Sequence, residues 1–395
     1  MNLLVDCIIF RKEPSGGIAR LFREILPRMC DLEPNLQISL MVDGPLLQDL
    51  PSHPQIRIIK TPPVKRNIRV KGIWRYVVYP FRRVASMTWN ITRSLWLGQG
   101  EGTIWHSTYY TRPSFWRGMQ VVSVYDMIHE NFPDLYSDPL DRIARTQKRR
   151  SINHAHAVIC ISETTCKDVR RYYNVDDDKL HVIPIAFNPV FRRLGSIEKN
   201  DVKFNKRTMI PEPFFLYIGT RSHHKNFLGL IDAFKNWEGN SNSYLVVVGL
   251  PWSNNEERLL KNLGMSEQVI LLNNVDDQTL CILYNLASAL VFPSIYEGFG
   301  IPLVEAMACG CPVVASRIPS TLEVAGEIPI YFEIHKPETF VAALDNVFQE
   351  GKTSERVIRG LERVRMYSWD RTAQQTLDIY RCLDVMMKTG NGKHG

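Results

Sequence analysis

The sequence lacks the features of a membrane-spanning or exported protein. No stretch approaches the roughly 18 uninterrupted apolar residues that a membrane-spanning helix needs. The opening residues, MNLLVDCIIF, carry neither the basic leader nor the small-residue cleavage site of a secretory signal, and they are typical of a buried first strand. These absences predict a cytoplasmic location.

Paired cysteines are also missing. The eight cysteines include no C-x-x-C pair, and most of them lie within apolar runs. We therefore expect reduced core residues, with a metal or redox role as the alternative. The acidic string at residues 176–178 lies in a turn-like stretch, YYNVDDDKLHV, where we expect solvated side chains rather than metal ligands. The sequence predicts neither a metal nor another cofactor.

Acidic residues are absent from Leu50 to Gly100, although the whole chain carries a net charge of only +7. The same stretch is rich in Lys and Arg, which alternate with Trp, Tyr and Phe. Basic residues mixed with interfacial aromatics favour an anionic surface. We expect peripheral contact with an anionic membrane through residues 50–100. A solvated basic face is the plain alternative, and nucleic acid is not expected because no recognition motif accompanies the charge.

The order of apolar segments predicts the fold class. A chain of 395 residues is more than twice the usual domain size, so we expect two domains. Strand-like runs such as VVSVYD and FFLYIG alternate with helical segments such as ARLFREILPRM, which indicates α/β architecture with parallel sheets. The periodicity weakens between residues 188 and 208 and restarts at PEPFFLYIGT. This pattern predicts two doubly wound units, with ligands at the carboxyl ends of their strands.

One short segment, SIYEGFGIPLVEAMACGCPVVAS, concentrates the candidate chemistry. It follows the strand-like run ALVFPS, and Pro302 suits the first turn of a helix that Gly310 can end. A helix that starts after a glycine loop at a strand's carboxyl end is a favourable anion site. Glu297 and Glu305 lie beside it and can accept hydrogen bonds from sugar or ribose hydroxyl groups. A glycosidase pair is disfavoured, because eight helical residues span about 12 Å and such carboxylates lie about 5–9.5 Å apart. The plain alternative for either glutamate is to complement the helix dipole.

The same segment resembles the E-x7-E signature of the family 4 retaining glycosyltransferases, which have the GT-B fold. The resemblance implies two Rossmann-like domains facing a central cleft: an acceptor-binding domain at 1–195, joined by a returning helix at about 367–385, and a nucleotide-sugar-binding domain at 208–366. It implies that Glu297 contacts the transferred sugar and Glu305 the nucleotide ribose. The donor-binding turn would then comprise Gly298, Phe299, Gly300 and Ile301.

Other segments extend the resemblance over nearly the whole chain. PSGGIARLFREIL is similar to the family's first glycine loop, where Gly16 and Gly17 would let the backbone approach a ligand. FFLYIGTRSHHKNFLGLIDAF is similar to the segment that supplies cations to the donor diphosphate, which implies Lys225 with Arg221 as its partner. NNVDDQTLCILYNLASALVFPS is similar to the base-holding segment, with Val275 near the base and Asn273 in place of the usual loop glycine.

One strand departs from the family pattern. Many members place a histidine near the reacting sugar in V-x-x-x-H-D, whereas this sequence has VVSVYDMIHE, with Tyr125 at the histidine position and Asp126 retained. Tyr125 can replace the histidine, or His106 or His129 can reach the ligand. Ordinary packing is the alternative for each histidine.

The resemblance, which is greatest to bacterial mannosyltransferase-type members, implies a metal-independent retaining glycosyltransferase. We expect it to move a hexose, first mannose from GDP-mannose, to a glycan or lipid-linked acceptor in cell-surface polysaccharide or lipopolysaccharide biosynthesis. A non-hydrolysing sugar-nucleotide epimerase or a phosphorylase on the same fold is the first alternative. A non-catalytic surface-binding protein that kept the fold is the second.

Overall fold

The computed structural model describes residues 1–12, 17–60, 100–113, 116–195 and 210–390. Gly16 and most of the acid-free basic stretch lie outside the described residues. The predicted membrane contact falls on that stretch, so it also lies outside them. The chain divides into two compact units. Unit 1 comprises Met1–Ile185 with Trp369–Gly395, and unit 2 comprises Ala186–Ser368.

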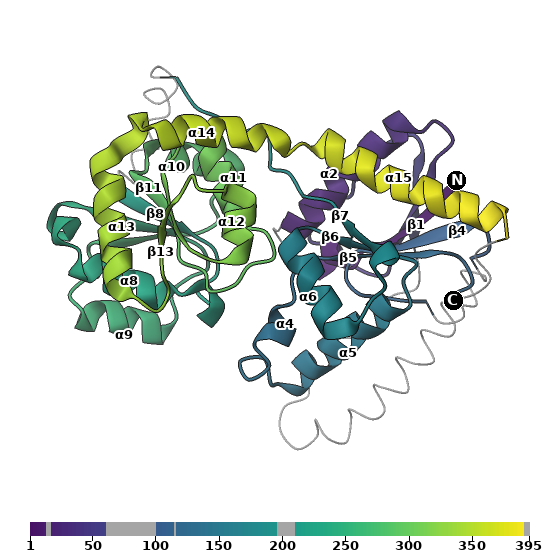
Figure 1. Ribbon diagram of the computed structural model, residues 1–395, viewed down its shortest axis with the longest axis horizontal. Helices are drawn as coiled ribbons and strands as arrows, with labels where there is room; N and C mark the ends of the chain where they lie inside the picture. Colours follow the sequence, from purple (N-terminus) through teal and green to yellow (C-terminus); the bar gives the residue numbers. More distant parts are fainter. Residues whose placement is uncertain (13–16, 61–99, 114–115, 196–209, 391–395) are drawn as a thin grey trace. The chain divides into compact units, whose positions relative to one another are not determined.

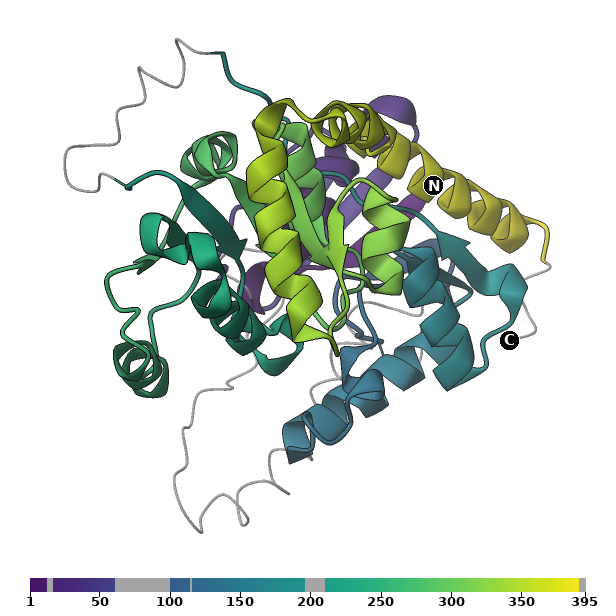
Figure 2. The same cartoon turned by 60° about the vertical axis from the view of Figure 1, so that its left-hand side comes forward.

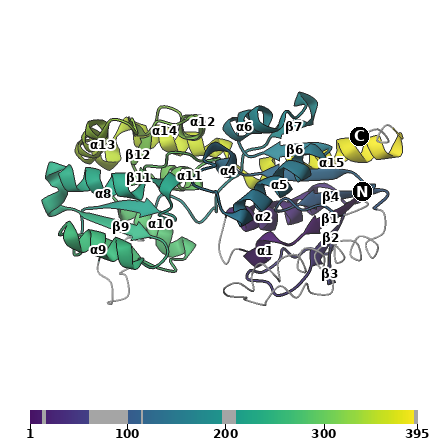
Figure 3. The same ribbon diagram turned by 90° about the horizontal axis from the view of Figure 1, so that it is seen from below.

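A seven-stranded sheet of order β3-β2-β1-β4-β5-β6-β7 forms the centre of unit 1, and the order can be followed in Figure 3. All of its strand pairs are parallel. Its central strands are apolar runs because helices cover both faces of such a sheet, and all five residues of QVVSV in β5 are buried. The strands are β1 (Asn2–Asp6), β2 (Gln37–Val42), β3 (Ile56–Lys60), β4 (Thr103–Ser107), β5 (Gln120–Val124), β6 (Ala157–Cys160) and β7 (Leu180–Val182).

The helices of unit 1 include one from the far end of the chain. In α2, Phe22, Ile25, Leu26 and Met29 recur at helical spacing and are buried. The last helix, α15, packs beside α2 and β4, as Figure 1 shows. The helices are α1 (Ile9–Lys12), α2 (Gly17–Leu32), α4 (Ile128–Asn131), α5 (Pro139–Asn153), α6 (Glu163–Tyr173) and α15 (Trp369–Lys388).

Unit 2 has a six-stranded parallel sheet of order β10-β9-β8-β11-β12-β13. The strands are β8 (Phe214–Ile218), β9 (Tyr244–Val248), β10 (Val269–Leu272), β11 (Ala289–Phe292), β12 (Val313–Ser316) and β13 (Ile330–Phe332). The helices are α8 (Phe227–Asn236), α9 (Asn254–Asn262), α10 (Asp277–Leu286), α11 (Ile301–Ala308), α12 (Pro319–Ala325), α13 (Pro337–Glu350) and α14 (Glu355–Arg363).

The core of unit 2 joins one set of helices to the sheet. Buried residues of α8, α9 and α13 form one hydrophobic cluster with the strands, and Figure 2 shows α13 lying over the strands. Phe332 of β13 stacks on Phe340 of α13, with ring centroids 3.7 Å apart. Three other helices, α10, α12 and α14, pack around α11.

Both sheets have a point where the strand order reverses. In unit 1 the chain moves outward from β1 to β3 and then returns to β4 on the other side of β1; in unit 2 it does the same from β8 to β10 and returns to β11. The loops that leave the carboxyl ends of the two central strands diverge at such a point, and ligands bind there in open α/β sheets. The predicted α/β class with two doubly wound sheets is confirmed.

The chain passes between the units earlier than we expected from the sequence. Residues 186–195 belong to unit 2 because they contact α10: the Asn188 side chain donates to Asp277 at 2.8 Å, and the Leu194 backbone N–H donates to Asn285 at 2.9 Å. The polar composition of this segment therefore reflects hydrogen bonding to a neighbouring helix rather than a free linker. The return to unit 1 occurs at Trp369.

Neither a membrane-spanning helix nor a metal cluster is found among the described residues. None of their helices combines the length and apolarity needed to cross a bilayer. No three His, Cys, Asp or Glu side chains among them are grouped to hold a metal ion. All eight cysteines are free, and every one except Cys382 is buried.

Candidate functional site

The turn between β11 and α11 is shaped by one glycine. Gly300 has φ +105°, and a Cβ built on it would lie 3.0 Å from a methyl carbon of Leu303. A side chain here would be strained by the backbone conformation and crowded by its neighbour. Helix α11 begins at the next residue, with Pro302 in its first turn. The backbone N–H groups at such a start lack partners within the helix and give it a partial positive charge, which suits an anion.

The two motif residues Lys225 and Glu297 meet beside this turn. Lys225 lies in the loop after β8 and Glu297 in the loop after β11, so they come from the two sides of the reversal point. The Lys225 ammonium is 2.5 Å from Glu297 Oε1, and the Ser294 hydroxyl donates to the same oxygen at 2.6 Å. The two side chains are 21% and 13% exposed. The pair is therefore well ordered and still accessible to a ligand.

Backbone bonds fix the loops that carry this pair. The Ile295 N–H donates to the His224 carbonyl oxygen at 2.7 Å, which links the loop after β11 to the loop after β8. The Ser316 hydroxyl donates to the Ser294 carbonyl oxygen and attaches the end of β12 as well. Three strand ends thus share one hydrogen-bonded edge.

Glu305 lies further along α11 and is buried. The Tyr284 hydroxyl of α10 donates to Glu305 Oε2 at 2.9 Å. Burial and the negative charge of Glu305 both raise the pKa of Tyr284 well above its usual value, so the hydroxyl remains a donor. Glu305 lies beyond the first turn of α11, which weakens the alternative that it only complements the helix dipole. Nothing in the sequence pattern indicated that Tyr284 would contact Glu305 or that Ser294 would contact Glu297.

The other residues that the resemblance assigns to donor binding lie in the loops that follow β10 and β11 or at the start of α11. Gly298 and Phe299 are buried, and the Phe299 ring packs edge-on against Tyr367 with centroids 5.4 Å apart. Ile301, the first residue of α11, is partly exposed, as is Val275 in the loop between β10 and α10. In that loop the left-handed residue is Asn274, with φ +52°. Asparagine tolerates this conformation. We expected Asn273 to replace the usual loop glycine, but the residue with the glycine-like backbone is the next one, Asn274.

Arg221 has a different environment from the one we expected. Its Nε donates to Glu256 Oε1 at 2.6 Å, and its terminal nitrogens donate to the carbonyl oxygens of Leu250 and Pro251. Its guanidinium also lies 4.5 Å from the centroid of the Trp252 ring. Burial alone would raise the pKa of Glu256, but hydrogen bonds from Arg221 and Ser253 outweigh it and lower that pKa to about 2. This arrangement favours a role in anchoring the loop after β9 over direct contact with a diphosphate.

Two substitutions separate these roles of Arg221. Arg221→Met and Glu256→Gln each disrupt the same ion pair, so each should lower the free energy of unfolding of unit 2 by about 2 kcal/mol. We expect both variants to weaken donor binding equally, as measured by calorimetry, because both loosen the same loop. A much weaker affinity in Arg221→Met than in Glu256→Gln would instead indicate direct contact with the diphosphate.

Two candidate residues of unit 1 are buried. His106 is 1% exposed, and its ring nitrogens contact the hydroxyl groups of Tyr380 and Ser123. Burial lowers the pKa of His106 to about 3, so the ring is neutral. The Tyr125 hydroxyl donates to the Thr108 carbonyl oxygen at 3.1 Å, and its side chain is also buried. These contacts favour the packing alternative for His106 and leave Tyr125 turned into the protein.

Asp126 is the accessible residue of this group. It follows β5, its carboxylate accepts a hydrogen bond from the Ile128 N–H at 3.1 Å, and its side chain is 42% exposed. His129 is partly buried against Tyr136, with ring centroids 4.7 Å apart. Gly17 is the first residue of α2, after the part of the loop that includes Gly16 and is not described.

Comparison with known families places both units in one group. Residues 198–363 match the model "Glycosyl transferases group 1", and residues 50–190 match the model "Glycosyltransferase Family 4". Together the two matches take in most of the chain. One match lies mainly in unit 2 and the other mainly in unit 1.

Curated relatives and solved structures agree with these matches. The chain is 29% identical over 252 residues to O-antigen chain mannosyltransferase B of Escherichia coli, and this match covers 62% of the chain and 66% of the relative. It is 29% identical over 255 residues to O-antigen chain mannosyltransferase RfbU of Salmonella typhimurium, covering 65% of the chain and 67% of the relative. The chain therefore spans about two thirds of these relatives.

The fold comparison covers nearly the full length. Sucrose-phosphate synthase from Thermosynechococcus elongatus has a TM-score of 0.73 at 17% identity, covering 97% of this chain and 98% of the other. WaaG, a glycosyltransferase involved in lipopolysaccharide biosynthesis, has a TM-score of 0.68 at 15% identity, covering 95% and 99%. Each of the two parallel sheets has a point where the strand order reverses, Lys225 pairs with Glu297 at one of these points, and two family models match the two halves of the chain. The chain belongs to the family 4 glycosyltransferases and has the GT-B fold.

Proposed function

We propose that this enzyme is a retaining hexosyltransferase that takes its sugar from a nucleotide donor, with mannose from GDP-mannose as the first candidate. The acceptor is a glycan or a lipid-linked saccharide of a cell-surface polysaccharide. The observation that carries this proposal is the Lys225–Glu297 pair beside the start of α11. The mannosyltransferase relatives support the choice of sugar.

The pair and the helix start have complementary roles toward a nucleotide sugar. The Lys225 ammonium and the N–H groups at the start of α11 stabilise the negative charge that collects on the departing diphosphate. The Glu297 carboxylate, oriented by Lys225 and Ser294, accepts hydrogen bonds from hydroxyl groups of the transferred sugar. Glu305 accepts from the ribose, and its second partner, Tyr284, fixes the direction of that carboxylate.

The reaction needs no protein nucleophile. The bond between the anomeric carbon and the phosphate oxygen breaks while the acceptor oxygen bonds to the same carbon on the same face. The acceptor's proton passes to the leaving diphosphate. Asp126 of unit 1 contacts the acceptor. We also propose a cytoplasmic location with peripheral membrane contact through residues 50–100, most of which lie outside the described part of the chain.

Release of nucleoside diphosphate tests this function. With an extract that contains lipid-linked saccharides, the protein should release GDP from GDP-mannose and form a product that keeps the donor's anomeric configuration by NMR. Glu297→Gln should slow the release about a hundredfold or more, whereas Glu333→Gln, at an exposed position of the same unit, should leave it unchanged. If no common sugar nucleotide gave diphosphate release, the proposal would be refuted; epimerised donor without transfer would favour the epimerase alternative.

A further inference from the structure

A buried lysine lies beneath the exposed carboxylate of unit 1. Lys148 belongs to α5, whose other basic residues include Arg142, Arg149 and Arg150, all exposed. Lys148 alone among these turns inward, and its side chain is 4% exposed. Removing an ammonium group from water is expensive unless partners compensate it. Arg145 is partly exposed, so Lys148 is the one fully buried basic residue of α5.

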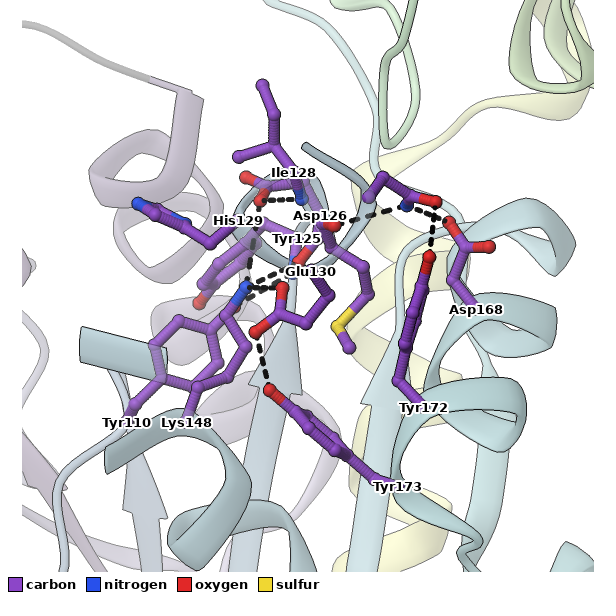
Figure 4. A network of polar contacts seen from close by, with 12 residues as sticks. Tyr110, Tyr125, Asp126, Ile128, His129, Glu130, Lys148, Asp168, Tyr172 and Tyr173 are labelled. Atoms are coloured by element: carbon purple, nitrogen blue, oxygen red, sulfur yellow. Dashed lines mark hydrogen bonds and ion pairs between the residues drawn. The ribbon is translucent and has the colours of Figure 1, made fainter. Parts of the chain in front are cut away.

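The partners of Lys148 come from the turn that follows β5, as Figure 4 shows. Its ammonium donates to Glu130 Oε2 at 2.9 Å and to the Asp126 carbonyl oxygen at 3.1 Å. Asp126 Oδ1 lies 3.9 Å from the same nitrogen, and the centroid of the Tyr110 ring lies 5.4 Å away. A lysine ammonium has three donors, and two of them are used by Glu130 and the Asp126 carbonyl oxygen.

Glu130 balances the charge of Lys148. Its side chain is 5% exposed, and the Tyr173 hydroxyl of α6 donates to Glu130 Oε1 at 2.5 Å. The carboxylate thus has a separate partner for each oxygen, one from α5 and one from α6. The buried pair is complete, so the turn after β5 is attached to two helices through charged hydrogen bonds.

Stability alone does not account for such a pair. Well-packed apolar residues of similar volume are often as stabilising as a buried ion pair, or more so. A lysine in this position instead fixes a geometry, because its hydrogen bonds have defined directions and specific partners. What it fixes is the backbone of Asp126, since it bonds to that residue's own carbonyl oxygen.

The exposed end of this network is the Asp126 carboxylate. It lies just after β5, at the carboxyl edge of the parallel sheet, where ligands of α/β proteins bind. Its neighbours Tyr125 and Lys148 are buried, while its own side chain is 42% exposed. The arrangement is a rigid support that presents one carboxylate to solvent.

We propose that Lys148 is a positioning residue for Asp126: through Glu130 and the Asp126 carbonyl oxygen it holds the turn after β5, so that the carboxylate keeps one orientation toward an acceptor hydroxyl group. This role rests on the proposed function, because it assumes that Asp126 contacts the acceptor. Lys148 itself does not touch the substrate.

A double-mutant cycle on transfer tests this role. Lys148→Met should lower kcat/KM for the acceptor by about a hundredfold, the size expected for a small misplacement of a reacting group. Donor affinity, which depends on unit 2, should not change. Asp126→Asn should cause a similar loss, and the double variant Lys148→Met/Asp126→Asn should be no slower than Asp126→Asn alone, because the lysine acts only through that carboxylate. Arg149→Met, a neighbouring exposed position on α5, serves as the matched control with unchanged rate.

A second variant separates positioning from stability. Lys148→Met alone leaves Glu130 buried without its cation, so the chain should unfold at a lower temperature. In Lys148→Met/Glu130→Gln no buried charge remains and the introduced amide oxygen would still accept from Tyr173, so the melting temperature should recover. Transfer should stay slow if Lys148 positions Asp126. If this double variant regained both stability and transfer, the proposal would be overturned. It would also be overturned if the rate losses of Lys148→Met and Asp126→Asn multiplied in their double variant. A wild-type protein without any transfer would refute the proposed function itself, which keeps the two failures distinct.

Discussion

Lys225→Met should slow sugar transfer about a hundredfold or more at saturating donor. The ammonium lies at the reversal point of the unit 2 sheet, 2.5 Å from Glu297 and beside the start of α11. Its charge matters most when the diphosphate leaves, because negative charge grows there in the transition state. The loss should therefore appear mainly in kcat, measured by diphosphate release under single-turnover conditions.

The control for this variant is a lysine outside the site. Lys261→Met removes one positive charge from the exposed end of α9 in the same unit, so it reports any effect of net charge alone. We expect its rate to match the wild type. A rate in Lys225→Met equal to that in Lys261→Met would contradict the diphosphate role and leave Lys225 as a structural partner of Glu297.

Glu305→Ala should weaken binding of the donor nucleotide by about ten- to a hundredfold, since a hydrogen bond to a charged group contributes about 1.5–3 kcal/mol. The carboxylate is buried, and the Tyr284 hydroxyl holds one of its oxygens at 2.9 Å. The variant also leaves that hydroxyl without its acceptor, which should reduce stability. Calorimetric titration with GDP and UDP measures the first effect, and thermal unfolding measures the second.

Two conservative changes distinguish ribose binding from scaffolding. Glu305→Gln keeps an acceptor for Tyr284 but loses the charge, and Tyr284→Phe keeps the charge but loses the donor. If Glu305 binds ribose, Glu305→Gln should bind nucleotide more weakly than Tyr284→Phe. Wild-type nucleotide affinity in both Glu305→Gln and Glu305→Ala would show that the glutamate only supports the helix pair.

The sequence predicted the architecture well because strands and helices leave periodic patterns. Alternation of apolar runs indicated two α/β units, and the glycine, proline and glutamate spacing located the start of α11. The resemblance placed Lys225 and Glu297 at one ligand, but their direct contact was not predictable from spacing, since they are 72 positions apart and meet because β8 and β11 are neighbours. Sequence spacing carries no information on strand order within a sheet.

The directions in which side chains point were also not predictable from the sequence. Arg221 lies four residues before Lys225, yet its guanidinium turns to Glu256 and the loop after β9. His106 and Tyr125 belong to the ends of β4 and β5, and both point into the protein. Lys148 was not singled out from the sequence, because nothing in the residue order showed that Glu130 would lie opposite it.

The attachment of α15 to unit 1 has a consequence for biosynthesis. Ala373, Leu377 and Tyr380 of this helix are buried, and Tyr380 contacts His106 inside the unit. All of unit 2 lies between these residues and the rest of unit 1 along the chain. The residues of unit 2 are therefore synthesised before α15, although α15 belongs to the core of unit 1. Unit 1, the first to be synthesised, thus lacks the helix that packs on α2 and β4 until the residues of α15 have been added.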